Sequence, residues 1–207
     1  MNESLPQSVG RLVLATHNDG KRVELQALLG DRFDVLTMVD LDLPSPPETG
    51  STFAENAALK ARQAAEASRM IALGDDSGLE VAALDGEPGI RSARFAGEPP
   101  NDANNRALLL LRMAGIPRRH RRARFVCSLA IAAPTGEIEI VEGTLEGLIA
   151  DKERGTNGFG YDPIFELANG STLAELSMDE KSRLSHRGQA LRRALPILRR
   201  LSGTGPS

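Results

Sequence analysis

The spacing of hydrophobic and polar residues changes repeatedly along the chain, and these changes predict alternating strands and helices. Short apolar runs bounded by glycine, proline, asparagine or aspartate have the length of buried strands. The predicted strands cover residues 11–15, 33–39, 70–73, 79–84, 123–133, 137–146 and 163–167. The two long runs at 123–133 and 137–146 are separated by Pro134, Thr135 and Gly136, which predicts a hairpin.

Apolar residues three and four positions apart predict helices between these strands. The predicted helices run from the turn at residues 16–20 to Gly30, from a capping box at Thr52 and Glu55 to about Arg69, from Asn101 or Asp102 to about Met113, and from near Ser185 onward. The apolar stripe of the first consists of Val23, Leu25, Leu28 and Leu29. Pro196 predicts a kink or an early end in the last helix.

This order of elements, with a long hairpin in the middle, predicts a mixed α/β sheet flanked by helices. Residues 11–201 are expected to form a single domain, between a flexible N-terminus at 1–10 and a flexible tail at 202–207. The stretch 41–50 is rich in proline and acidic residues and predicts an irregular loop.

Composition narrows the classes of protein that fit. Across 207 residues the net charge is −3, so no overall basic field attracts the chain to nucleic acid or to an anionic membrane. No apolar run approaches the roughly 20 residues that cross a bilayer. Cys127 is the single cysteine, which excludes an internal disulfide and a cysteine cluster for zinc. We therefore expect a cytoplasmic protein without a membrane or nucleic-acid partner.

The turn Thr16-His17-Asn18-Asp19-Gly20-Lys21 connects the first strand to the first helix. Backbone N–H groups at such a helix start attract anions, and a lysine adds a positive charge, so the turn is a candidate phosphate loop. Asparagine, aspartate and glycine at this place also serve simply as helix caps. Local chemistry alone leaves the two interpretations evenly balanced.

Acidic residues gather around the strand predicted at 70–73. Asp75 and Asp76 follow it directly, and Glu48 lies in the proline-rich loop. Mg²⁺ prefers one or two carboxylates together with water and substrate phosphate, so these three side chains are candidate magnesium ligands. The alternative is a solvated turn, because Asp-Asp-Ser-Gly is also typical of turns.

A third group lies in the last third of the chain. Phe159 and Tyr161 stand in the glycine-rich segment 155–163 of a chain with only 3% aromatic residues, and their rings offer flat faces for a base. Lys181, Ser185, His186 and Arg187 gather donors near the predicted start of the last helix. The ordinary alternatives are a core aromatic pair and a capping or surface histidine.

Six segments, in this order, resemble the inosine triphosphate pyrophosphatase family, whose members remove deaminated purine nucleotides such as dITP and XTP. They are LATHNDGK (14–21), ETGSTFAENAALKA (48–61), DDSGLEV (75–81), PGIRSARFAG (88–97), GTNGFGYDPIF (155–165) and AELSMDEKSRLSHRGQAL (174–191). The resemblance spans the chain from about Leu12 to Arg200. It implies an elongated central sheet and two lobes with the active-site cleft between them.

The resemblance also implies a role for each matching residue. The triphosphate would be held by Thr16, His17, Asn18, Asp19, Gly20, Lys21 and Lys60. Glu48, Asp75 and Asp76 would form the Mg²⁺ site, with Asp76 also the proton acceptor, and Ser77 would touch the substrate. The base pocket would be lined by Phe159, Gly160, Tyr161 and Asp162, and the purine would be read by Lys181, His186 and Arg187.

The implied reaction is hydrolysis of a purine nucleoside triphosphate (ITP, dITP or XTP) to the monophosphate and pyrophosphate by a homodimer. Three other hypotheses remain open. The first is a related pyrophosphatase for pyrimidine or modified nucleotides, and the second is a nucleotide-binding module without turnover. The third is nucleic-acid binding through the arginine-rich run 118–124, for which a solvated connection is the stronger alternative.

Overall fold

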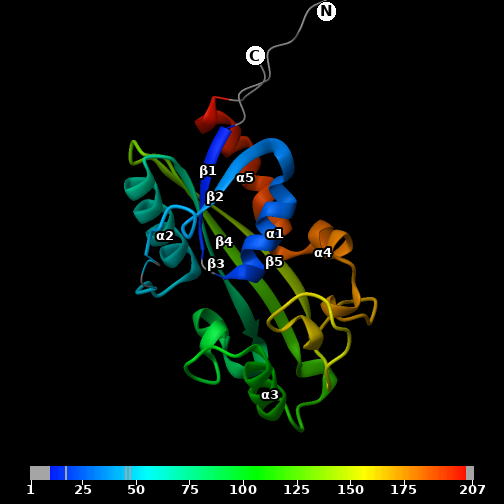
Figure 1. Cartoon of the computed structure of the whole chain (residues 1–207). Helices are drawn as coiled ribbons and strands as arrows, with labels where there is room; N and C mark the ends of the chain where they lie inside the picture. Colours follow the sequence, from blue (N-terminus) through cyan, green and yellow to red (C-terminus); the bar gives the residue numbers. More distant parts are fainter. Residues whose placement is uncertain (1–9, 17, 45, 47, 204–207) are drawn as a thin grey trace, which may run out of the picture. The chain divides into compact units, whose positions relative to one another are not determined.

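The structure is a computed structural model that describes residues 10–16, 18–44, 46 and 48–203. The predictions made for 1–9, 204–207 and His17 lie outside these residues. Within them, a single sheet has six strands in the order β2-β1-β3-β4-β5-β6 (Figure 1). The strands are β1 (Gly10–Ala15), β2 (Phe33–Thr37), β3 (Ile71–Val81), β4 (Arg122–Ala132), β5 (Ile138–Ile149) and β6 (Phe165–Glu166). β1 pairs in parallel with β2 and β3, and β5 pairs antiparallel with β6, which confirms a mixed sheet.

The described residues form α-helices α1 (Asp19–Leu29), α2 (Phe53–Ser68), α3 (Asp102–Arg112), α4 (Met178–Leu184) and α5 (His186–Ser202). The predicted starts of the first three are confirmed, because the side chains of Asn18, Thr52 and Asn101 each accept a backbone N–H of the following helical turn. Glu55 departs from the predicted capping box: its carboxylate accepts from both the backbone and the hydroxyl of Ser51, each at 2.7 Å.

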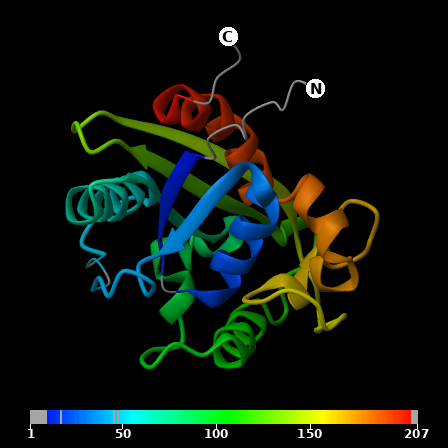
Figure 2. The same ribbon diagram turned by 45° about the horizontal axis from the view of Figure 1, so that its top comes forward.

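The chain divides into two compact units that share long strands. The first unit takes residues up to Asp75, then Ser128–Val141 and the chain from Ala190 onward. In it, α2 covers one side of β1 and β3, and α1 and α5 lie on the other side (Figures 1 and 2). Its core packs small alanines of α2 against β1, β3 and β4. Small side chains allow the close approach of helix and sheet on which the polar contacts described below depend.

The second unit takes residues Asp76–Cys127 and Glu142–Gln189. It has its own core, built from larger side chains: Leu79, Leu109, Met113, Phe125, Tyr161 and Phe165 are among its buried members. Cys127 is fully buried at the end of this segment of β4, as expected of a core residue. Each unit therefore buries its own hydrophobic cluster.

One correction concerns the acidic segment. Two strands separated by a turn were predicted at 70–73 and 79–84, but β3 runs without interruption through Gly74 and Asp75–Gly78 and ends at Val81. A Cβ at Gly74 would lie 2.3 Å from the carbonyl oxygen of Ala57 in α2. Packing of the strand against this helix therefore overrides the local preference of Asp-Asp-Ser-Gly for a turn.

Other boundaries also differ from the predictions. Lys181 lies in α4, a helix that the hydrophobic spacing did not reveal and that a capping box of Ser177 and Glu180 opens. The last helix does not end early at Pro196 but continues to Ser202. The predicted strand at 163–167 is mostly a 3₁₀ turn, and only Phe165 and Glu166 pair with β5.

The predicted stripe of the first helix is confirmed at Leu25 and Leu29, is partly buried at Leu28, and is wrong at Val23. Leu25 and Leu29 are buried, but Val23 is 41% exposed and Glu24 is buried in its place. The strand that follows ends at Thr37 rather than Val39. The side chain of Asp40 closes this end, because its carboxylate accepts the backbone N–H of Thr37 at 2.7 Å, and hydrogen bonds from Thr37 hold the pKa of Asp40 below its usual range.

Candidate functional site

The turn between β1 and α1 is a helix cap. Asn18 Oδ1 accepts the backbone N–H of Lys21 at 3.0 Å, and the backbone N–H of Asn18 donates to Thr16 Oγ1 at 3.2 Å. Capping and phosphate binding do not exclude each other, because the cap satisfies one of several N–H groups at the helix start. The capped turn is the local geometry that the phosphate hypothesis requires. His17 lies outside the described residues.

Four charged residues distant in sequence meet in the first unit. Lys21 Nζ lies 2.6 Å from Asp75 Oδ1, and the side chain of Asp75 is fully buried. Lys60 Nζ, from α2, lies 2.5 Å from Glu48 Oε1 and donates to the Asp75 carbonyl oxygen at 3.2 Å. Two lysines, from α1 and α2, thus contact two carboxylates, from β3 and the proline-rich loop.

Asp76 follows Asp75 in β3 and is 5% exposed. Consecutive side chains of a regular strand point to opposite faces, so the two carboxylates diverge more than they would in a turn. Among the described residues, no group of three or more His, Cys, Asp or Glu side chains is already assembled for a metal. Carboxylate oxygens nevertheless suit Mg²⁺, which needs only one or two of them when phosphate and water supply the rest.

A second polar group lies within the second unit. Arg187 is almost fully buried at the start of α5, and its Nη2 donates to Ser77 Oγ at 2.8 Å. Its guanidinium lies 5.7 Å from the centre of the Phe159 ring, and Lys181 Nζ lies 4.8 Å from the same centre. Lys181 also pairs with Asp162 at 2.5 Å. The half-buried Phe159 ring thus stands beside two cations, which an aromatic ring attracts.

The segment Gly155–Asp162, which we name the aromatic loop, folds around the Asp162 carboxylate. Asp162 Oδ2 accepts the backbone N–H of Phe159 at 2.9 Å. Gly158 has φ +76°, and a Cβ there would lie 2.0 Å from the same oxygen. Glycine is therefore required at 158 for two reasons, the left-handed backbone and the space that the carboxylate fills.

Tyr161, predicted to line the base pocket, and His186, predicted to read the purine, both contact other residues of the second unit. Tyr161 is buried, its hydroxyl donates to the Ser92 carbonyl at 2.8 Å, and burial raises the pKa of this hydroxyl. His186 is also buried and stacks on Phe125, with ring centres 4.7 Å apart. Of the two aromatic side chains in the loop, only Phe159 is partly exposed, so it is the one whose ring a base could reach.

The chain is similar to several known proteins. A model of the Ham1 family matches residues 12–197. The chain belongs to the Ham1 family. Its relatives include the dITP/XTP pyrophosphatase of Exiguobacterium sibiricum, 53% identical over 88% of this chain and 94% of that protein. The dITP/XTP pyrophosphatase of Desulforamulus reducens is 50% identical over 92% and 96%. A Ham1 protein from Coxiella burnetii has a solved structure with a TM-score of 0.83, 41% identity, and coverage of 92% of this chain and 98% of that one.

Sequence patterns missed one set of contacts in this Ham1 protein. Asp102 was predicted only as a helix cap, and no pattern in the sequence marks Arg106 as a functional residue. Both side chains in fact bind the backbone of Gly160 in the aromatic loop, at 2.8 Å and 2.9 Å. No motif links residues more than fifty positions apart, so only the tertiary structure reveals them.

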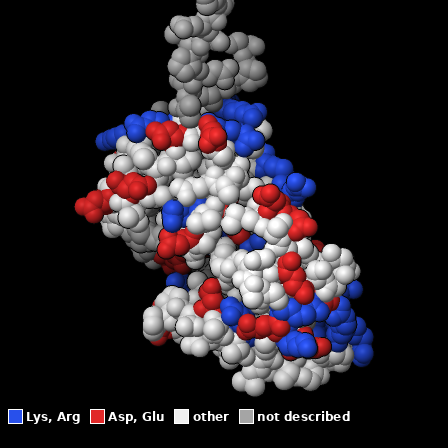
Figure 3. All heavy atoms as spheres, turned by 45° about the vertical axis from the view of Figure 1, so that its right-hand side comes forward, with Lys and Arg blue, Asp and Glu red and all other residues white. Residues whose placement is uncertain are grey.

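The arginine-rich run 118–124 is engaged with acidic partners. Arg118 pairs with Glu166, Arg121 with Asp151, and Arg124 with Glu80. Basic and acidic side chains are interspersed on the face drawn in Figure 3. These ion pairs favour the solvated connection over a nucleic-acid site. In the part of the chain that the structure describes, no helix is long and apolar enough to cross a membrane.

Proposed function

We propose that this chain hydrolyses deaminated purine nucleoside triphosphates (ITP, dITP and XTP) to the monophosphate and pyrophosphate. Relatives that are about half identical over nearly their full length bear the name dITP/XTP pyrophosphatase. The contact between Arg187 and Ser77 carries the proposal best. It holds a buried cationic donor next to an aromatic ring and to the residue that follows Asp76.

The lysine–carboxylate pairs supply the phosphate end of the site. Lys21 and Lys60 neutralise Asp75 and Glu48 in the protein without substrate. The turn Thr16–Lys21 and the two ammonium groups are the donors for the triphosphate, and we include His17 on the resemblance alone. When the nucleotide binds, each lysine exchanges its carboxylate for phosphate oxygens, which are equally strong partners.

Glu48, Asp75 and Asp76 are the side chains that would hold Mg²⁺. Bound there, the ion neutralises phosphate charge and polarises the α-phosphorus. Exchange of lysine partners exposes Glu48 and Asp75 at the moment when triphosphate arrives. Phosphate oxygens of the substrate and water would supply the remaining ligands of the ion.

Asp76 accepts the proton of the attacking water. The oxygen of this water forms a bond to the α-phosphorus, the bond from this phosphorus to the bridging oxygen breaks, and pyrophosphate leaves. Burial of Asp76 keeps bulk water from competing for its carboxylate. No covalent intermediate is needed, because phosphoryl-type transfer depends mainly on positioning and charge stabilisation.

The residues that would read the base select it by the hydrogen-bond donors and acceptors that the base presents. Hypoxanthine and xanthine carry a carbonyl where adenine carries an amino group. Arg187, Lys181 and His186 offer N–H groups that donate to the carbonyl oxygen, whereas the amino group of adenine would face other donors and find no acceptor. An unpaired buried donor costs about 1–3 kcal/mol, which corresponds to roughly 5- to 150-fold in affinity. Phe159 supplies the stacking surface, and Gly160, Tyr161 and Asp162 shape the pocket.

Isotope labelling tests the proposed bond cleavage. Hydrolysis of ITP in ¹⁸O-water with Mg²⁺ should place the label in inosine monophosphate and leave pyrophosphate unlabelled. Label in pyrophosphate, or release of orthophosphate from a triphosphate, would show attack at another phosphorus and refute the proposed chemistry. A pyrimidine panel in the same assay separates this function from that of a pyrimidine-directed pyrophosphatase.

The active protein is further proposed to be a homodimer in the cytoplasm, on the resemblance to its family. Gel filtration with light scattering over a dilution series should give twice the chain mass of 22.2 kDa. A single monomer mass at every concentration would contradict the dimer without affecting the proposed reaction.

A further inference from the structure

Two side chains of α3 hold one residue of the aromatic loop. The backbone N–H of Gly160 donates to Asp102 Oδ2 at 2.8 Å, and Arg106 Nη1 donates to the Gly160 carbonyl oxygen at 2.9 Å. Asp102 and Arg106 are four positions apart, so they lie on the same face of the helix. We call this pair of contacts the α3 clamp.

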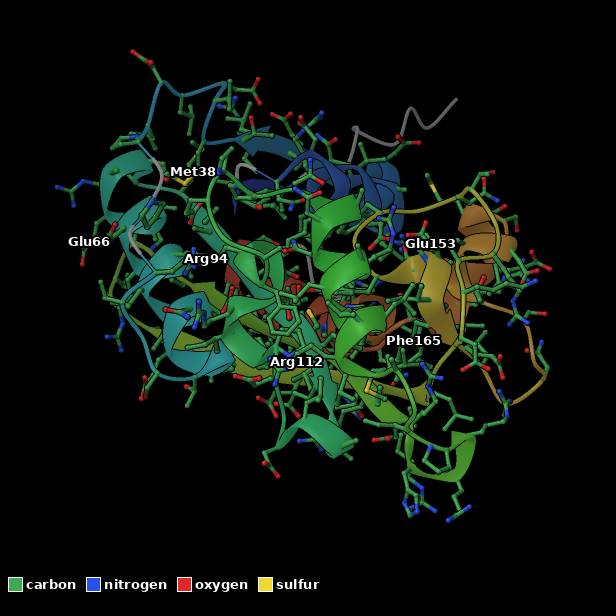
Figure 4. The ribbon with its side chains drawn as sticks, turned by 90° about the horizontal axis from the view of Figure 1, so that it is seen from below. Met38, Glu66, Arg94, Arg112, Glu153 and Phe165 are labelled. Atoms are coloured by element: carbon green, nitrogen blue, oxygen red, sulfur yellow. The ribbon has the colours of Figure 1, made fainter. Side chains whose placement is uncertain are left out.

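The clamp uses both hydrogen-bonding groups of a single peptide residue. Both bonds involve a charged side chain, and charge-assisted bonds are stronger than neutral ones. Arg106 is itself oriented, because its Nε donates to Glu153 Oε1 at 2.9 Å (Glu153 is labelled in Figure 4). Gly160 has φ +60°, and a Cβ there would meet nothing within 4 Å, so the side-chain position of this residue is open.

The rest of the loop is anchored elsewhere. The backbone N–H groups of Thr156 and Asn157 donate to the Ala174 carbonyl at 3.1 Å and 3.0 Å. Asp162 holds Phe159 from within the loop at 2.9 Å. The α3 clamp is therefore the contact that ties the residue after Phe159 to a regular element outside the loop.

We propose that Asp102 and Arg106 are positioning residues that fix the Phe159 ring for base recognition. They do not reach the base themselves. They hold the adjacent peptide, and a rigid peptide keeps the ring beside Lys181 and Arg187 without an entropic cost on binding. This role rests on the proposed function, because it concerns the same base-reading loop.

The first test needs no substrate. Hydrogen exchange of the Gly160 amide in the nucleotide-free protein reports directly on its bond to Asp102. Asp102→Ala should speed exchange about tenfold or more, and Asp102→Asn should restore protection, since its amide oxygen still accepts. Wild-type exchange in Asp102→Ala would overturn the clamp. Failure of Asn to rescue would show that the charge acts on the helix dipole of α3 rather than on the loop.

The second test measures base recognition. Asp102→Ala and Arg106→Ala should each raise KM for ITP about tenfold with a smaller change in kcat, and should lower the ITP-to-ATP ratio of kcat/KM about fivefold. Arg112→Ala is the matched control, because Arg112 lies on the same helix but pairs with Glu87 (Arg112 is labelled in Figure 4). The control should leave both the KM and the ratio unchanged.

The two tests separate the clamp from the proposed function. Faster Gly160 exchange with unchanged KM and selectivity would refute the positioning role. A wild-type protein that fails to prefer ITP would refute the proposed function, while exchange would still decide whether the clamp exists. If Asp102→Ala proves unfolded by circular dichroism, Arg106→Ala carries both measurements, because the cap residue Asn101 and the first turn of α3 stay intact.

Discussion

Three of the four lysines in this protein lie beside a carboxylate. Of the 25 basic residues only four are lysines, yet Lys21, Lys60 and Lys181 each lie within 2.6 Å of a carboxylate oxygen. An ammonium group is a compact point charge that can change partner by a small rotation, whereas a guanidinium prefers a fixed bidentate geometry. Under the proposed function this difference suits Lys21 and Lys60, which would exchange a carboxylate for phosphate.

At this scale Asp76 gives the sharpest prediction. Asp76→Asn should lower kcat for ITP by about 100-fold or more, since amide oxygen cannot accept the proton of water, while nucleotide binding is retained. Steady-state kinetics and isothermal titration calorimetry measure the two effects. Asp151→Asn, a change at an exposed carboxylate that pairs with Arg121, is the control. Full activity of Asp76→Asn would remove this residue as the proton acceptor.

Gly158 and Gly160 form a matched pair for the loop. Both have a left-handed backbone, but only at 158 would a Cβ collide, with Asp162 Oδ2 at 2.0 Å. Alanine should cost about 1–2 kcal/mol of unfolding free energy at either position, with about 1–3 kcal/mol more at 158. Chemical denaturation measures the difference. Equal losses at the two positions would show that Asp162 moves aside freely.

At the scale of the element, local signals predicted helix starts well and strand limits less well. Asn18, Thr52 and Asn101 are caps in the structure as in the sequence, because capping is a contact between near neighbours. β3 could not be predicted as one strand, since its continuity depends on contact of Gly74 with Ala57 in α2. The sequence also indicates Lys21 and Asp75 as candidate site residues. The ion pair between them depends on the tertiary fold, so only the structure shows it.

The short strand β6 carries a prediction about pH. Glu166 is buried, and a hydrogen bond from Arg118 is the main cause that lowers its pKa, with Arg154 as a second partner at 3.0 Å. A carboxylate with a lowered pKa stabilises the fold fully above the ordinary glutamate pKa of about 4.3, and this contribution is lost as the pH falls through the lowered value.

Glu166→Gln removes the ionisable group. The unfolding free energy of this variant should therefore fall less than that of the wild type as the pH is lowered from about 6 to about 3. Urea denaturation across this range measures the slope. Glu87→Gln, which changes an exposed partner of Arg112, should follow the wild type. A variant at Glu166 with the wild-type slope would show that this carboxylate does not drive acid sensitivity.

At the scale of the whole molecule, the polar groups follow the division into two units. The lysine–carboxylate pairs of Lys21 and Lys60 lie in the first unit, and the contact of Arg187 with Ser77 lies in the second. Each group rests on its own hydrophobic cluster, so each can be preorganised by local packing. β3 carries both, because Asp75 ends one segment of the first unit and Asp76 begins the second.

We propose that this Ham1 protein selects deaminated purines by the polarity of its hydrogen-bond donors. The most direct measurement compares kcat/KM for ITP and ATP by pyrophosphate release with Mg²⁺ at a single pH. We expect ITP to be favoured by at least about tenfold, which is the effect of one donor that the adenine amino group leaves unpaired. Equal values for the two nucleotides would contradict it.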